Sequence, residues 1–217
     1  MRKFDPGFAV AGSIMTIIFL MLVNYLTSSQ YVWFFYPSFV LSLWPIGVYC
    51  VKKGKHKQLA LSYSLLLISF LTVENFLHSP QYPWSILTIY PIFWWPILVF
   101  LEKRALTLTV ALIGSSTIIF YYAVLNVFVW PQHPWAIYPA FVVLWWPLTI
   151  YHAKRKTFFA FSLHATLLLT IFFITVNAIS STGEIWAVYP IFCVLWWPLS
   201  MYYFVYKRRL YGSRSSR

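Results

Sequence analysis

Ionisable side chains are scarce in the apolar parts of this sequence, so the few that occur there are the first candidates for chemistry. Glu74 and His78 are four residues apart and would share one face of a helix. His133 and Glu184 occur in later polar turns. These groups could bind a cation or sense pH, but no HExxH pattern and no Cys/His spacing typical of a metal site accompanies them. We therefore favour a solvated surface cluster and expect no metal.

A further histidine, His164, lies about six residues into a long apolar run, where an ionisable group in a membrane is a candidate for function. A neutral histidine bonded to a neighbouring helix explains the same position equally well, and the sequence leaves both interpretations open. His56 and His152 accompany basic segments and are expected to be interfacial.

The remaining polar residues do not predict catalysis. No nucleophile, base and orienting acid occur together, and Asp5 and Glu102 are isolated acids. A glycine-rich phosphate loop is missing as well. Cys50 and Cys193 are expected at different depths, unpaired, as small packing residues. The sequence therefore predicts neither an enzyme nor a cofactor.

Three residue types recur every 51 residues along the chain. The recurring positions are Trp33, Trp84, Trp135 and Trp186, then Pro45, Pro96, Pro147 and Pro198, and Asn24, Asn75, Asn126 and Asn177. Three markers that hold one period indicate a fourfold internal repeat. The repeats cover approximately 1–53, 54–104, 105–155 and 156–206, followed by a basic tail at 207–217. We expect one membrane domain over 1–217, with disorder only at the end of the tail.

Composition assigns these repeats to a membrane. Hydrophobic residues make up 61% of the 217 residues and charged residues 9%, against about 25% charged residues in soluble domains. Each repeat contains two apolar runs, of which the first reaches the roughly 20 residues that cross a bilayer. The first runs are Phe8 to Leu26, Leu59 to Leu77, Leu106 to Val129 and Phe158 to Ile179. The second runs are Val32 to Val51, Trp84 to Leu101, Trp135 to Tyr151 and Ile185 to Tyr206.

The first apolar run follows Arg2-Lys3 and so resembles a signal peptide. It is longer than an ordinary signal-peptide core, and no small-residue cleavage pattern follows it. It also occupies the place that Leu59 to Leu77 holds one period later. We expect it to be retained as a helix.

The basic residues give the orientation. All sixteen Lys and Arg fall in five places: Arg2-Lys3, Lys52 to Lys57, Lys103-Arg104, Lys154 to Lys156 and Lys207 to Arg217. The turns at 27–33, 78–84, 129–135 and 180–186 contain none. By the positive-inside rule, we expect both termini on the cytoplasmic side and the four turns on the outer side. The expected membrane is the plasma membrane. This placement also explains the net charge of +12 without nucleic acid as a partner.

The expected fold class is an all-α integral membrane protein of eight transmembrane helices, built as four tandem two-helix hairpins. Because each repeat contains an even number of spans, all four copies share one orientation. They should be parallel, pseudo-symmetric repeats around an axis along the membrane normal.

The order Asn, outer turn, Trp, Tyr-Pro and Trp-Trp-Pro resembles the uncharacterised bacterial two-transmembrane-helix (2TM) domain. His164 upstream of Asn177, and Tyr151-His152-Ala153-Lys154 at the end of the third repeat, are similar to the histidine-bearing ends of that family. This chain differs in carrying four copies, and in having Pro where the family more often has Gly. The resemblance implies the hairpin fold, and it brings no established activity.

Two sets of tryptophans differ in depth. Trp33, Trp84, Trp130, Trp135 and Trp186 lie at outer helix ends, where indoles anchor at the headgroup level. The Trp-Trp-Pro segments lie about 10 to 12 residues further in, or roughly 15 to 18 Å, which is too deep for anchoring. The prolines of these segments have no N–H, so the carbonyls four residues before them, of Leu41, Ile92, Val143 and Val194, have no donor within their own helix. We expect kinked helices and indole N–H groups or waters as donors to these carbonyls.

Two interpretations of the repeated residues remain open. In the first interpretation, the helix bends serve packing alone. In the second, an amphiphilic ligand is surrounded by Trp44, Trp95, Trp146 and Trp197. Likewise the four asparagines could cap helix ends, or form a polar ring that binds a headgroup or gates a pore. His164 completes the candidate ligand-binding residues.

The sequence favours a non-catalytic membrane module that binds lipids or a partner membrane protein. The alternative is a small transporter or a flippase for lipids or amphiphilic molecules, with a central aromatic-lined site. A filled centre favours the module, and a central cavity lined by repeat-equivalent polar residues favours the transporter.

Overall fold

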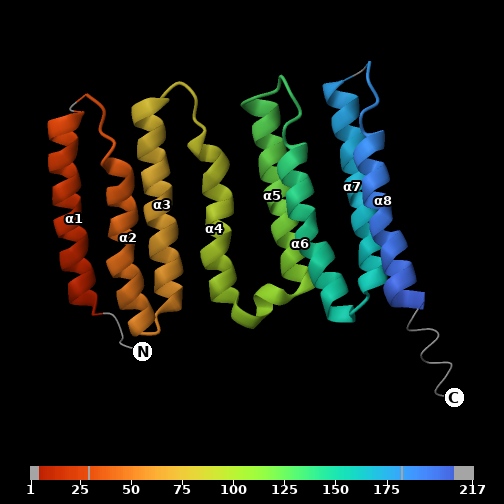
Figure 1. Ribbon diagram of the computed structural model, residues 1–217, viewed down its shortest axis with the longest axis horizontal. Helices are drawn as coiled ribbons and strands as arrows, with labels where there is room; N and C mark the ends of the chain where they lie inside the picture. Colours follow the sequence, from red (N-terminus) through yellow and green to blue (C-terminus); the bar gives the residue numbers. More distant parts are fainter. Residues whose placement is uncertain (1–4, 29, 182, 208–217) are drawn as a thin grey trace. The chain divides into compact units, whose positions relative to one another are not determined.

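The computed structural model describes residues 5–28, 30–181 and 183–207, and these residues form helices and turns without any strand. Eight α-helices follow one another along the chain (Figure 1). They are α1 (Pro6–Thr27), α2 (Phe35–Lys52), α3 (His56–His78), α4 (Ser85–Leu101), α5 (Leu108–Phe128), α6 (Ile137–Arg155), α7 (Phe158–Ser180) and α8 (Val188–Met201). A short 3-10 helix, η1 (Glu102–Leu106), follows α4, and a π-helical turn, η2 (Tyr202–Tyr206), follows α8.

Every apolar run that was expected to cross the membrane is a helix, and the all-helical fold is confirmed. Six helices are long and apolar enough to cross a bilayer: α1, α3, α5, α7, α4 extended to Leu106, and α8 extended to Tyr206. The expected helices α2 and α6 are present but fall outside this set, and both end in basic residues. The end of the tail, 208–217, lies outside the described residues.

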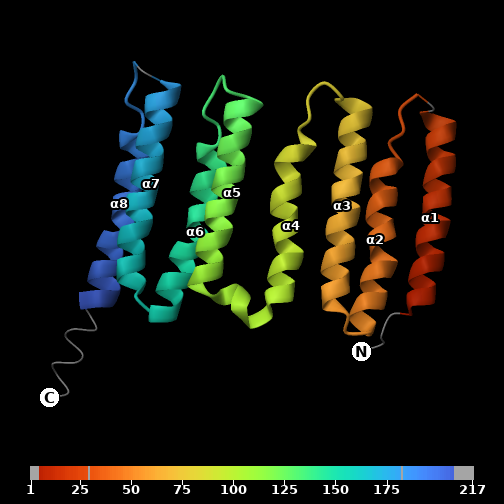
Figure 2. The same ribbon diagram turned by 180° about the vertical axis from the view of Figure 1, so that it is seen from behind.

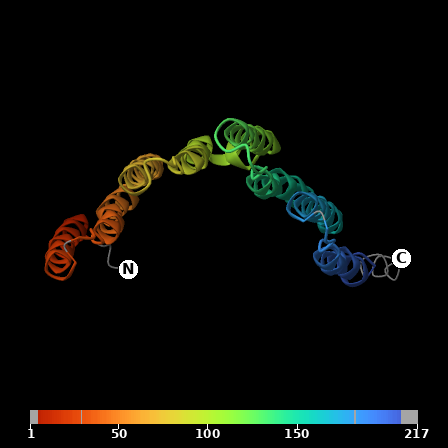
Figure 3. The same ribbon diagram turned by 90° about the horizontal axis from the view of Figure 1, so that it is seen from above.

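The chain separates into two compact units, Met1–Glu102 and Lys103–Arg217. In the first unit, α1 packs against α2, α2 against α3, and α3 against α4. Figure 2 shows these four helices from behind, and Figure 3 shows them from above, in chain order. The first unit is therefore a row of two hairpins in which each helix contacts its neighbours along the chain.

The second unit has the same order of packing. Helix α5 packs against α6, α6 against α7, and α7 against α8, while η2 contacts both α7 and α8 (Figure 1). In both units the two helices of each hairpin make the most extensive contact, and the hairpin is the basic packing element.

Small residues form the contact surface within each hairpin. One buried position near the start of each odd-numbered helix recurs every 51 residues, as does a second position four residues later. The first set is Ala9, Ala60, Ala111 and Ser162, and the second is Ser13, Ser64, Ser115 and Thr166. Residues four apart lie on one helix face, and small side chains there let two helices approach closely in a membrane. Large apolar side chains project outward instead.

Candidate functional site

In the first three hairpins, the odd-numbered helix brings its second small residue to a carbonyl one turn before the proline of the partner helix. Proline has no N–H, so the carbonyl four residues before it loses its helix partner. In the first three hairpins a serine hydroxyl donates to this carbonyl. The bonds are Ser13 Oγ to Leu41 O at 2.9 Å, Ser64 Oγ to Ile92 O at 3.4 Å and Ser115 Oγ to Val143 O at 3.1 Å. The even-numbered helices continue through Pro45, Pro96 and Pro147 without a break.

The expectation that indole N–H groups or waters satisfy these carbonyls is wrong for these three hairpins, where serine is the donor. A hydroxyl on a short side chain can reach across a close helix contact, whereas an indole needs more space. The sequence contains the signal, because Ser13, Ser64 and Ser115 keep the 51-residue period of the prolines.

The fourth hairpin differs. Thr166 takes the place of serine there, and its side chain is 7% exposed. Its Oγ1 is buried and makes no hydrogen bond with the part of the chain that the structure describes. A buried hydroxyl without a hydrogen-bond partner costs free energy. Thr166 is therefore expected to stabilise its hairpin less than the three serines stabilise theirs.

The four asparagines organise the turns that close the hairpins. Each side chain is 4–8% exposed and makes three hydrogen bonds to the backbone of the following turn. In the third hairpin, Asn126 Nδ2 donates to Trp130 O and His133 O, both at 2.8 Å, and Asn126 Oδ1 accepts from the N–H of Ala136 at 3.0 Å. Asn24, Asn75 and Asn177 bond the residues four, seven and ten places later in the same way.

This pattern uses both amide hydrogens and the amide oxygen of each asparagine on the protein itself. It extends the cap interpretation, because the bonds reach beyond the helix end to the start of the next helix. A role of the same residues in binding a headgroup remains a prediction.

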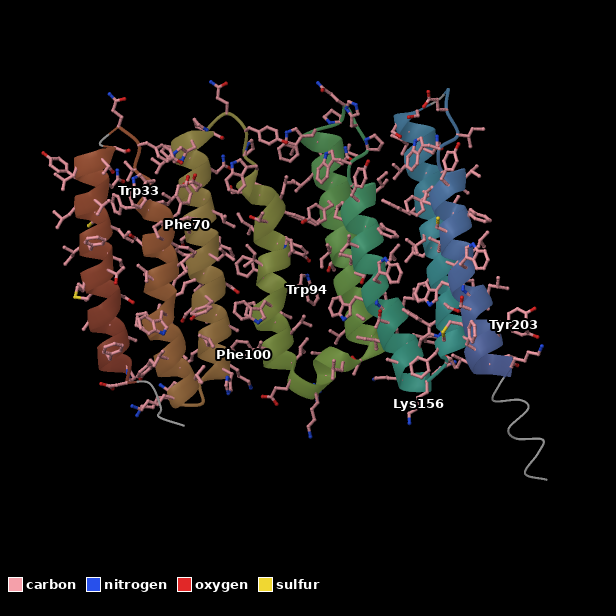
Figure 4. All side chains as sticks on the ribbon, viewed as in Figure 1. Trp33, Phe70, Trp94, Phe100, Lys156 and Tyr203 are labelled. Atoms are coloured by element: carbon pink, nitrogen blue, oxygen red, sulfur yellow. The ribbon has the colours of Figure 1, made fainter. Side chains whose placement is uncertain are left out.

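The inner tryptophans keep much of their surface exposed. Trp44 is 38%, Trp95 45% and Trp197 36% exposed. Each presents an edge-to-face contact to an aromatic residue of its hairpin partner: Phe8, Tyr63 and Phe161, respectively. Trp146, the remaining member of the predicted set, is half-buried. Figure 4 shows Trp33 near the turn of the first hairpin and Trp94 about halfway along α4, as the two depths require.

His164 in α7 pairs with His152 in the last turn of α6. His164 Nδ1 lies 3.1 Å from His152 Nε2, and His152 Nδ1 lies 2.7 Å from Thr157 Oγ1. His164 is thus bonded to a neighbouring helix, one of its two expected interpretations. His152 is 3% exposed, so it is buried within the protein at the end of α6, and its interfacial position remains a prediction. No periodic marker pointed to this pair, whose members lie on opposite sides of the loop between α6 and α7.

Glu74 and His78 share one helix face, as their spacing predicts. Glu74 Oε1 lies 3.0 Å from His78 Nδ1 and accepts a hydrogen bond of 2.6 Å from the hydroxyl of Tyr36. Within the described residues, no group of three His, Cys, Asp or Glu side chains is placed to hold a metal ion. The backbone carbonyls of His133 and Glu184 accept hydrogen bonds from Asn126 and Asn177, so these two turn residues take part in turn structure.

No protein-family model matches the chain, and neither a curated protein nor a solved structure matches it.

Proposed function

We propose that this chain is a non-catalytic, multi-pass protein of the plasma membrane, a module that binds lipids or a partner membrane protein. Its four tandem hairpins are structural repeats, each crossing the membrane twice, with both termini and all basic segments in the cytoplasm.

The observation that carries this proposal is the use of the recurring polar groups. The four asparagines and three of the four small hydroxyl residues bond backbone groups of their own hairpin, so they are not available to line a hydrophilic path. The outward-facing surface is apolar: Phe120 and Phe128, for example, are 70% and 80% exposed. Such a surface is stable only against lipid or another apolar protein surface.

Helix length supports eight crossings. Helices α2 and α6 contain 18 and 19 residues and are about 27 to 29 Å long, close to the roughly 30 Å of the hydrocarbon core. Each starts beside a turn without basic residues and ends in a basic segment. The basic residues of their last turns lower mean hydropathy, and Lys and Arg side chains at a helix end can extend to the membrane interface.

The alternative function, a small transporter or flippase for lipids or amphiphilic molecules, is favoured by the inner tryptophans. Indoles that expose a third or more of their surface at mid-helix, as Trp95 and Trp197 do, could contact a moving amphiphile.

A lipid-translocation assay separates the two functions. The full chain is reconstituted into vesicles that contain a fluorescent phospholipid, and dithionite quenching reports movement between leaflets. The module predicts the same quenched fraction as in empty vesicles, with lipid nevertheless co-purifying. A quenched fraction above that of empty vesicles, which the double variant Trp146→Leu, Trp197→Leu abolishes, would overturn the module and support the flippase.

A further inference from the structure

Each unit carries a groove beside a proline of an even-numbered helix. The first groove, with a volume of about 560 Å³, is lined by α1, α2 and α3. The second, of about 510 Å³, is lined by α5, α6 and α7. The two grooves occupy equivalent places, because lining residues of the first lie 102 residues before lining residues of the second. The pairs include Val10 and Leu112, Pro45 and Pro147, Ile46 and Leu148, and Tyr49 and Tyr151.

The walls of both grooves are largely apolar. Pro6 and Val10 of α1 face Pro45 and Ile46 of α2 in the first groove. In the second, Leu108 and Leu112 of α5 take the place of the α1 residues. Such a wall fits hydrocarbon, and a volume of this size lies in the range of about 300 to 1,000 Å³ that holds small ligands.

A basic side chain lies over the ring of the tyrosine that lines each groove. Lys55 Nζ lies 5.6 Å from the centre of the Tyr49 ring. The guanidinium carbon of Arg155 lies 4.4 Å from the centre of the Tyr151 ring, and Arg155 Nη1 donates to the Tyr151 hydroxyl at 2.7 Å. Both cations belong to basic segments, and Figure 4 shows Lys156, next to Arg155, at the end of the hairpin remote from its outer turn.

The polar part of the lining differs between the grooves. Cys50 and Ser62 in the first correspond to His152 and His164 in the second. The apolar wall, the proline and the tyrosine with its cation are therefore the shared features, and they define the common ligand.

We propose that each groove holds one acyl chain of an anionic phospholipid of the cytoplasmic leaflet, with the phosphate against Lys55 or Arg155. The chain lies along the apolar wall beside the proline, and the headgroup lies at the tyrosine. Basic pockets between transmembrane helices on the cytoplasmic side suit anionic headgroups. This inference rests on the proposed membrane module and names its lipid class and two sites.

Native mass spectrometry of the full chain tests the proposal. The protein, in mild detergent, is mixed with equal amounts of phosphatidylglycerol and phosphatidylcholine that share the same acyl chains, and the retained lipids are counted. The expected result is two phosphatidylglycerol molecules, retained in preference to phosphatidylcholine.

Groove-filling variants assign the two molecules. Leu112→Trp should lose one phosphatidylglycerol, Val10→Trp the other, and the double variant both. The matched control is Ile113→Trp, because Leu112 and Ile113 are 50% and 55% exposed but Ile113 does not line the groove. Retention of two lipids by the double variant would overturn the sites.

Charge variants test the headgroup. Lys55→Gln and Arg155→Gln should each lower phosphatidylglycerol affinity about fivefold at one site, the effect expected for one basic residue near a membrane surface. Lys103→Gln, in η1, alters a basic residue that lines neither groove and should leave the affinity for phosphatidylglycerol unchanged. Equal retention of the two lipids by the unaltered chain would overturn the anionic headgroup. That result would leave the module standing, because the module fails only if the chain translocates lipid.

Discussion

The hydroxyl of Ser115 donates to the carbonyl of Val143 at 3.1 Å, across the hairpin of α5 and α6. Val143 is four residues before Pro147, which has no N–H to offer this carbonyl. The serine on one helix therefore replaces the hydrogen bond that the proline removes from the other. Ser13 and Ser64 do the same for Leu41 and Ile92, which makes the contact a repeated feature of the hairpins.

Replacing Ser115 with alanine should destabilise the protein by about 1 kcal/mol, because the Val143 carbonyl then has no donor in an apolar environment. The free energy of unfolding is measured by denaturant titration in detergent micelles. Ser116→Ala is the matched control, since Ser116 is the exposed neighbour of buried Ser115 and should give no change. Equal effects of the two variants would contradict the assigned role.

Pro147→Ala should make the serine dispensable. An alanine at 147 supplies the N–H that Val143 lacks, so Ser115→Ala should cost less in this background than in the original chain. A double-mutant cycle measures the difference. Additive effects of the two substitutions would show that serine and proline do not share the carbonyl.

Thr166→Val should leave the free energy of unfolding unchanged or raise it by up to about 1 kcal/mol, because it removes a buried hydroxyl that makes no hydrogen bond within the described residues. The same denaturant titration compares it with Ser115→Ala. If Thr166→Val proves as destabilising as Ser115→Ala, the threonine has a partner and the fourth hairpin is equivalent to the others.

Asn126→Ala should destabilise the turn between α5 and α6 by about 3 kcal/mol, since three backbone hydrogen bonds of roughly 1 kcal/mol each are lost. Limited proteolysis of the turn and denaturant titration both report the change. Gln132→Ala alters an exposed residue of the same turn and serves as the control. An Asn126→Ala variant as stable as this control would leave the amide without a structural role.

His152→Phe should cost more stability than His164→Phe, by about 1 kcal/mol, because His152 is buried and bonds both His164 and Thr157. Loss of His164 leaves the bond to Thr157 in place. Denaturant titration of the two single variants and the double variant gives their coupling. A coupling near zero would mean that the two imidazoles do not share a hydrogen bond.

The sequence predicted the helices well because apolar length and the 51-residue period are strong signals. The turn asparagines were also recognised, since their position at the helix ends is periodic. The donor to the proline-freed carbonyl was misassigned, because a serine in a helix is compatible with several roles and only the geometry shows that Ser115 reaches Val143. The bond between His152 and His164 joins residues from two helices at non-periodic positions, which local pattern does not encode.

Labelling of introduced cysteines tests the central claim, that four hairpins cross the membrane eight times, most directly. In a Cys50→Ala, Cys193→Ala background, single cysteines replace Gln30 or Lys53, which flank α2, and Gln132 or Lys154, at the two ends of α6. A membrane-impermeant maleimide should label positions 30 and 132 in intact cells, and positions 53 and 154 only after permeabilisation. If both positions around α2, or both around α6, react from the same side, that helix does not cross and the account is contradicted.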